Sequence, residues 1–168
     1  MVSKLRRIAR HVLATTRGAR RAFPDALLQR IEKAVHAGEG LHDGEVRFAI
    51  ETELGWPALL AGETARERAL EVFAFLRTWD TELNNGVLIY VLYADHDVEI
   101  VADRGYNGRV SHAEWQRVCD LMRGHFARGE FEAGSLGGIA AVSELMATHF
   151  PAVPGRRRDE LPDRPVML

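Results

Sequence analysis

Apolar and polar positions along the chain predict eight elements in the order α–α–β–α–β–β–α–α. Alternation predicts strands over residues 45–51 and 97–103, and an unbroken apolar run predicts a buried strand over residues 87–94. Apolar spacings of three and four residues predict five helices. They cover residues 3–14, a segment from Pro24 to the glycines at 38 and 40, residues 65–79, a segment from Ser111 to Gly129, and roughly residues 131–149.

The order of these elements predicts the fold. The strand over residues 45–51, the helix over 65–79 and the strand over 87–94 form a right-handed crossover with parallel strands. A turn near Asp95 and His96 then returns residues 97–103 as an antiparallel edge strand. Since the central strand is apolar throughout, we expect helices on both faces of the sheet. The prediction is a single-domain α/β/α sandwich with a small mixed sheet.

Composition narrows the class of protein. The chain has 168 residues, 46% of them hydrophobic, and a formal net charge of −2, which does not favour a nucleic-acid partner. A single cysteine, Cys119, excludes an internal disulfide and falls in an apolar stripe, where we expect it in the core. The sequence has no apolar stretch of about 20 residues and no signal-peptide core, so we expect a cytoplasmic location.

The two ends of the chain differ from its middle. Residues 1–21 contain seven basic side chains and no acid, and residues 3–14 predict an amphipathic helix with a basic face. We expect a solvated helix on the domain edge; the alternative is peripheral contact of residues 3–21 with an anionic membrane surface. Residues 152–168 are charged and proline-rich, which predicts disorder. The folded domain is then expected over residues 22–151.

Several segments resemble the TPM domain family, in its soluble bacterial type. They read "GEVRFAIE", "RERALEVF", "LNNGVLIYVLYADHDVEIVADRGY" and "HFARGEFEAGSLGGIAAVSELMATHFP". The resemblance covers about residues 22–151 and implies an α/β/α sandwich. It also implies a choice of roles, since some members resemble acid phosphatases or bind calcium and others are accessory proteins. Classical members have a signal peptide and a C-terminal membrane helix, neither of which the sequence shows.

The ends of the predicted hairpin offer a candidate site. A turn at Asp95 and His96 places Gly86 opposite Gly105 and brings the asparagines before the central strand close to the Asp-Arg pair after the edge strand. Carboxylate and amide oxygens suit calcium or magnesium, and an arginine suits an anion. The alternative is that Asn, Asp and Gly only form turns and caps here. The predicted metal ligands are Asp80, Glu82, Asn84, Asn85 and Asp103, with Arg104 for an anion and Asp43 or Glu45 at the margin.

The opposite end of the sheet is the second candidate. Ligands of open α/β sheets usually bind beyond the carboxyl ends of parallel strands. The side chains expected there are Glu51, Glu53, Asp95 and Asp97, with His96. A tight polar turn explains most of them equally well. The chain has no HExxH, GxSxG, P-loop or GxGxxG motif, so no organic cofactor is expected. Glycines in "GSLGG" (134–138) predict close helix packing, and Trp56 is either a partner surface or part of the core.

Two functions remain open at this point. The first is a non-enzymatic binding or accessory module that recognises a protein partner, expected at the cell envelope, and binds a divalent cation. The second is a metal-assisted phosphatase. In that hypothesis Asp103 with Asp80 or Glu82 holds the metal, and Arg104 binds the phosphoryl oxygens.

Overall fold

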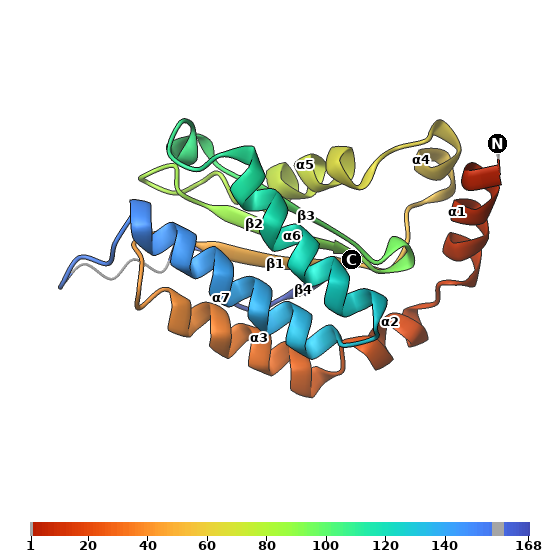
Figure 1. Ribbon diagram of the computed structural model, residues 1–168, viewed down its shortest axis with the longest axis horizontal. Coiled ribbons are helices and arrows are strands. Elements are labelled where there is room, and N and C mark those ends of the chain that lie inside the picture. The colour runs from red at the N-terminus through yellow and green to blue at the C-terminus, as the bar shows by residue number, and fades with distance from the viewer. Residues whose placement is uncertain (1, 156–159) are drawn as a thin grey trace.

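A four-stranded sheet in the order β3-β2-β1-β4 forms the centre of the molecule (Figure 1). The computed structural model describes residues 2–155 and 160–168. The strands are β1 (Val46–Glu51), β2 (Val87–Leu92), β3 (Asp97–Ala102) and β4 (Val166–Met167). β1 pairs with β2 in parallel, and β2 pairs with β3 in antiparallel orientation, which confirms the predicted mixed sheet.

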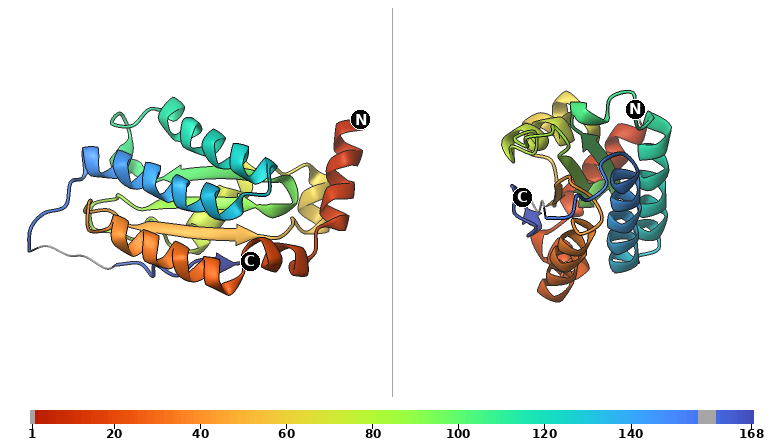
Figure 2. Two further views of the ribbon diagram at one scale, coloured as in Figure 1. Left: turned by 60° about the horizontal axis from the view of Figure 1, so that its bottom comes forward. Right: turned by 90° about the vertical axis from the view of Figure 1, so that its left-hand side faces the viewer.

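Helices cover both faces of this sheet, as predicted (Figure 2). One face packs on α3 (Asp25–Gly38), α6 (His112–Ala127) and α7 (Phe131–His149), and the other packs on α5 (Ala65–Phe75). Three further helices lie at one end of the molecule: α1 (Val2–Leu13), α2 (Thr16–Ala22) and α4 (Trp56–Ala61). The chain also forms two short 3-10 helices, η1 (Tyr93–Asp95) and η2 (Arg104–Tyr106). Within the described part of the chain, no helix is both long and apolar enough to cross a bilayer.

Successive side chains of each strand point to opposite faces of the sheet, so the core consists of two layers, one on each face. Phe48, Ile89 and Ile100 face α3, α6 and α7, whereas Leu88 and Tyr90 face α5. β2 is buried along its whole length, which explains its unbroken apolar sequence. The apolar faces are removed from water on both sides, and this burial is the main stabilising contribution to the fold.

Helix starts and helix contacts follow the sequence signals. Thr64 with Glu67 and Ser111 with Glu114 both form capping boxes, at the starts of α5 and α6. The "GSLGG" segment lies inside α7 and packs on α6, so the prediction of close helix packing is confirmed. Cys119 is buried in the first core layer, where burial raises the pKa of its thiol to about 11.

The predicted hairpin register is wrong by two residues. Val87 lies opposite Ala102, and the Asp103 N–H donates to the Gly86 carbonyl at 2.9 Å, so Gly86 faces Asp103 and not Gly105. The reason is the loop. η1 and His96, whose φ is +51°, make a four-residue connection, whereas a two-residue turn centred on Asp95 and His96 had been expected.

The predicted disorder of the C-terminal segment is also wrong for residues 160–168. β4 pairs in parallel with β1, and the Leu168 N–H donates to the Ile50 carbonyl at 2.8 Å. The Glu45 carboxylate accepts the N–H groups of residues 160 and 161, both at 3.2 Å, and Arg47 donates to the Pro162 carbonyl. The open edge of β1 supplies these partners, which a charged, proline-rich composition does not reveal. Residues 156–159 of that tail lie outside the described residues.

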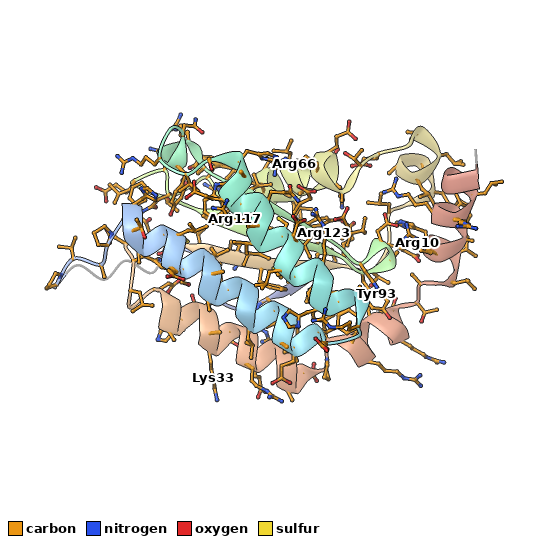
Figure 3. All side chains as sticks on the ribbon, in the orientation of Figure 1. Arg10, Lys33, Arg66, Tyr93, Arg117 and Arg123 are labelled. Atoms are coloured by element: carbon orange, nitrogen blue, oxygen red, sulfur yellow. The ribbon has the colours of Figure 1, made fainter. Side chains whose placement is uncertain are left out.

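Arginines close the other edge of the sheet. Arg66 from α5 donates to the Ile100 carbonyl at 2.6 Å, and Arg123 from α6 donates to the Val98 carbonyl at 2.7 Å (Figure 3). The Val98 N–H is bound by the Asp97 carboxylate at 2.9 Å. These contacts occupy backbone groups through which an edge strand would otherwise pair with another chain.

Candidate functional site

The Asn-Asn-Gly and Asp-Arg-Gly segments meet at one end of the sheet and form a hydrogen-bonded turn. Asn84 adopts a left-handed backbone conformation, with φ of +53°, and its side-chain oxygen accepts a hydrogen bond from Arg104 Nε at 2.7 Å. Asp103 Oδ1 accepts the Arg104 N–H at 2.7 Å and so caps η2. Three of the predicted site residues are therefore brought together, and the contacts between them are those of turns and caps.

Asn85 connects this turn to the start of β1. Its side chain is buried, and Nδ2 donates to the Asp43 carbonyl at 2.6 Å. Its own N–H donates to Thr81 Oγ1 at 3.0 Å, and its carbonyl accepts the Tyr106 hydroxyl at 3.2 Å. Asn85 thus holds the ends of two strands and the preceding loop in place.

The acidic members of the predicted metal set lie apart. Asp80 is exposed and forms an ion pair with Arg77 at 2.5 Å, and Glu82 lies exposed in the loop before β2. Asp103 Oδ2 is buried and accepts no hydrogen bond from a described residue. Within the described chain, Asp80, Glu82 and Asp103 do not form a group of ligand atoms lying within 4.8 Å of one another.

At the opposite end of the sheet, Asp95 is held by α1. Arg7 and Arg10 each donate to its carboxylate at 2.7 Å, and His11 Nε2 lies 3.2 Å from Oδ2. Burial alone would raise the pKa of Asp95, but the hydrogen bonds and charges of Arg7 and His11 outweigh it and lower that pKa. The carboxylate therefore attaches the N-terminal helix to the hairpin turn.

Among the described residues, two of the other acids at this end are paired with arginines. Asp97 forms an ion pair with Arg123 at 2.5 Å. The buried Glu51 carboxylate accepts two hydrogen bonds from Arg68 at 2.9 Å and one from the Tyr90 hydroxyl at 2.6 Å. Glu53 is exposed. These pairs are structural contacts between strands and helices.

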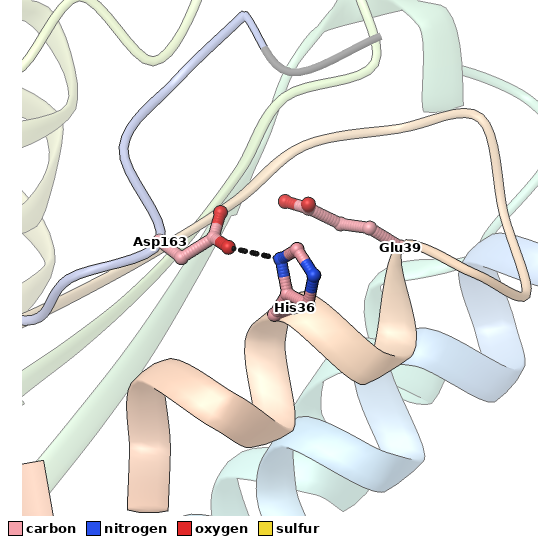
Figure 4. A group of neighbouring side chains, drawn as sticks. All are labelled: His36, Glu39 and Asp163. Atoms are coloured by element: carbon pink, nitrogen blue, oxygen red, sulfur yellow. Dashed lines mark hydrogen bonds and ion pairs between the residues drawn. The ribbon is translucent and has the colours of Figure 1, made fainter. Parts of the chain in front are cut away.

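A different group of side chains has the spacing of metal ligands. His36, Glu39 and Asp163 each offer one ligand atom, and these atoms all lie within 4.8 Å of one another (Figure 4). His36 Nδ1 and Asp163 Oδ2 are 2.8 Å apart, and Glu39 is 8% exposed. Asp163 Oδ1 is buried and accepts no hydrogen bond from a described residue.

Elements far apart in the sequence form this group. His36 is in the last turn of α3, Glu39 follows the helix directly, and Asp163 belongs to the C-terminal segment held by Glu45 and Arg47. A hollow of ≈ 710 Å³ adjoins it, lined by His36, Glu39 and residues 152–155 among others. One imidazole nitrogen and two carboxylates suit zinc, manganese or iron, whereas calcium takes oxygen ligands alone.

His42 lies on the wall of the same hollow, in surroundings that disfavour protonation of its ring. Its Nδ1 lies 2.9 Å from the Gly44 carbonyl and donates to it, while the buried Nε2 has no partner among the described residues. Burial lowers the pKa of His42 to about 4, despite the opposing effects of Gly44 and the Asp43 charge. Protonation would therefore bury a charged ring with an unpaired N–H.

We therefore expect acid to destabilise the protein through His42. Its folded-state pKa lies below the unfolded value of 6.5, so the stabilisation is complete above pH 6.5 and is lost as the pH falls toward 4. The loss at pH 5 is expected to be about 2 kcal/mol. Urea unfolding at pH 7 and pH 5 measures it, and His42→Gln should lose correspondingly less than wild type. An exposed-histidine control, His112→Gln, should behave as wild type; equal losses in all three proteins would contradict the assignment.

Sequence reasoning missed the His36 group for an identifiable reason. Asp163 lies in the segment for which the composition predicts disorder, and a disordered segment supplies no fixed partner for His36 or Glu39. The available signal was the short apolar end of the chain, "VML", which follows Pro165 and contains β4. A strand there brings residues 160–165 alongside β1 and α3.

By its fold, this protein is a small α/β/α sandwich, with polar groups at both ends of its sheet. The TPM domain family matches residues 18–145, and the chain belongs to that family. β4 and Asp163 lie beyond the matched range.

Solved structures share the fold of this chain, and one of them matches most of it. The NMR structure of the BA42 protein from the psychrophilic bacterium Bizionia argentinensis has 29% sequence identity and a TM-score of 0.74. The similarity covers 85% of this chain and 93% of that chain. A search of curated proteins finds no match.

Proposed function

We propose that this TPM-domain protein is a non-enzymatic binding module that takes up a divalent cation at His36, Glu39 and Asp163. The observation that carries the proposal is the convergence of three ligand-type side chains within 4.8 Å. The buried Asp163 Oδ1, which accepts no hydrogen bond from a described residue, supports it. A bound cation would offset part of the cost of burying the Asp163 carboxylate, beside which His36 and Arg47 lie among the described residues.

The proposed site has a consequence for the C-terminal segment. Asp163 comes from that segment and the other two ligands come from the end of α3. A cation would therefore hold residues 160–168 against the domain more firmly, next to the hollow lined by His36 and Glu39. A protein partner at the cell envelope is part of the proposal, and the surface around this hollow is where we expect it to bind.

Calorimetric titration of the intact protein with zinc, manganese, calcium and magnesium tests the cation site. We expect saturable one-to-one binding of zinc or manganese and weaker binding of calcium and magnesium. His36→Gln should lower the affinity by at least about tenfold, since it removes the nitrogen ligand. His36 is itself mostly exposed on α3, so the variant should fold. A matched control, His112→Gln, removes an exposed histidine of α6 and should bind as wild type.

The same titration separates this site from the hairpin end. Asp103→Asn keeps the side-chain oxygen that caps η2 but removes the charge of the predicted ligand. If Asp103→Asn weakened binding and His36→Gln did not, the cation would belong with Asn84 and Asp103 and our assignment would be wrong. Absence of any saturable binding would also overturn it.

The phosphatase hypothesis has less support. Its metal ligands Asp80, Glu82 and Asp103 do not converge in the described chain, and Arg104 donates to Asn84. Turnover of a phosphate ester by the metal-loaded protein, lost in Asp103→Asn, would restore that hypothesis.

A further inference from the structure

α1 is oriented with its basic face toward the protein. Arg7 and Arg10 (the latter labelled in Figure 3) reach the Asp95 carboxylate in the hairpin turn. His11 is buried beside that carboxylate. The Leu54 N–H donates to His11 Nδ1 at 3.1 Å, which fixes the ring from the other side. Of the apolar side chains described in α1, Ile8 packs against the second core layer. This is the reverse of the usual arrangement, in which the apolar face of a surface helix is packed and the charged face is solvated.

The apolar face of α1 consequently points to solvent. Leu5 is 63% exposed, Val12 is 56% exposed and Leu13 is 78% exposed. Leu5 and Val12 are seven residues apart and so share one side of the helix, and Leu13 lies next to Val12 around its circumference. Single exposed leucines are common on protein surfaces, but a helix face built from them marks an interaction site.

α4 adds exposed apolar side chains at the same end of the molecule. It lies beside α1 in both views of this end (Figures 1 and 2), and Arg7 Nη1 donates to the Glu63 carbonyl just after it at 2.7 Å. Trp56 and Leu60 are each 58% exposed and are four residues apart, on one side of α4. A tryptophan with its ring exposed is typical of the boundary between water and lipid.

The basic side chains near the exposed apolar face of α1 indicate which kind of partner would bind it. The first 24 residues contain no acid, and Arg7 and Arg10 are engaged with Asp95. The exposed arginines that remain are Arg6 of α1 and three residues of α2, Arg17, Arg20 and Arg21. A second copy of the chain would bring the same arginines together and be repelled, whereas an anionic surface would attract them.

We propose that α1 lies on the surface of anionic lipid bilayers, with Leu5, Val12 and Leu13 inserted among the acyl chains. Arg6, Arg17, Arg20 and Arg21 contact the headgroups, and Asp95 holds the helix in this orientation before binding. Preorganisation removes part of the ordering cost that a disordered segment would have on binding. The combination of a short apolar helix face with several cationic side chains is the usual requirement for reversible attachment to a membrane surface.

Flotation of the intact protein with vesicles tests the proposal. We expect binding to phosphatidylcholine vesicles that contain phosphatidylglycerol, little binding to phosphatidylcholine alone, and release by high salt. The double variant Leu5→Gln/Leu13→Gln should lower the partition coefficient by about tenfold or more, because burial of even one leucine side chain is worth about that factor. Glutamine is a good helix former and both positions are exposed, so α1 should persist, and circular dichroism checks this.

A matched control removes two exposed leucines elsewhere. Leu70→Gln/Leu121→Gln changes α5 and α6 and should float as wild type. Three results would overturn the proposal: no binding to anionic vesicles, equal binding to neutral vesicles, or equal loss in the control variant. A wild-type dimer that Leu5→Gln/Leu13→Gln makes monomeric, without vesicle binding, would instead identify the face as a contact between copies of the chain.

Discussion

Replacing Gly86 by alanine should lower the free energy of unfolding by about 4 kcal/mol, among the largest effects of any single substitution in this chain. Gly86 precedes β2, where the loop from α5 folds back over the strand. A β-carbon at this position would lie 1.9 Å from the Thr78 carbonyl oxygen and 3.0 Å from its carbon. Because these atoms belong to the backbone, a change of side-chain rotamer cannot relieve the overlap. The strand or the loop must move instead.

Urea and thermal unfolding of Gly86→Ala measure the effect, with an expected decrease in melting temperature of roughly 8–16 °C. Gly137→Ala is the matched control. Its new β-carbon would have Leu121 Cδ2 as its nearest neighbour at 3.7 Å, an ordinary contact, and it lies inside α7. Alanine should therefore stabilise the helix there by about 0.5–1 kcal/mol. If Gly86→Ala unfolded at the same urea concentration as wild type, the close approach of Thr78 to Gly86 would be incorrect.

The close contact at Gly86 shows that the Asn-Asn-Gly segment contributes to the fold. Its glycine allows the loop to pass close to β2, Asn84 supplies a left-handed backbone residue, and Asn85 holds β1. Each residue type therefore has a structural reason to be present. The sequence predicted that these segments meet, because two strands joined by a short loop must bring their far ends together. The register was missed because the loop contains one helical turn more than the shortest hairpin.

The strongly patterned elements were predictable from local spacing alone. The buried central strand, the two capping boxes and α7 follow from residues that are neighbours in the sequence. The orientation of α1 does not, since its ion pairs are with Asp95, more than 80 residues away, and Leu5 and Leu13 stay exposed. β4 is a similar case, because the edge of β1 that it covers becomes available only when the sheet has formed.

Candidate sites are harder to predict than elements. The hairpin residues Asn84, Asp103 and Arg104 were expected to be close and are in contact. The acids expected beside them, Asp80 and Glu82, do not converge with Asp103 among the described residues. A prediction of ligand convergence requires side-chain directions to within a few ångströms. Residue patterns fix only the end of the sheet at which a side chain lies.

Arg68→Ala should lower the free energy of unfolding by about 3 kcal/mol, because it leaves the Glu51 carboxylate buried without its cation. Arg68 binds both oxygens of Glu51, whose side chain is only 10% exposed, and that hydrogen bonding raises the pKa of Arg68. The Tyr90 hydroxyl donates to the same carboxylate at 2.6 Å. Since Arg68 is itself 31% exposed, water will enter in its place, and we expect the lower end of the range for broken buried pairs.

A double-mutant cycle distinguishes the unpaired charge from lost packing. Glu51→Gln keeps an oxygen for Tyr90 and removes the charge, so Glu51→Gln/Arg68→Ala should be more stable than Arg68→Ala alone. Arg30→Ala breaks the exposed pair with Glu132 and should cost no more than about 1 kcal/mol. A cost of Arg68→Ala no larger than this control would mean that water replaces the buried guanidinium without penalty.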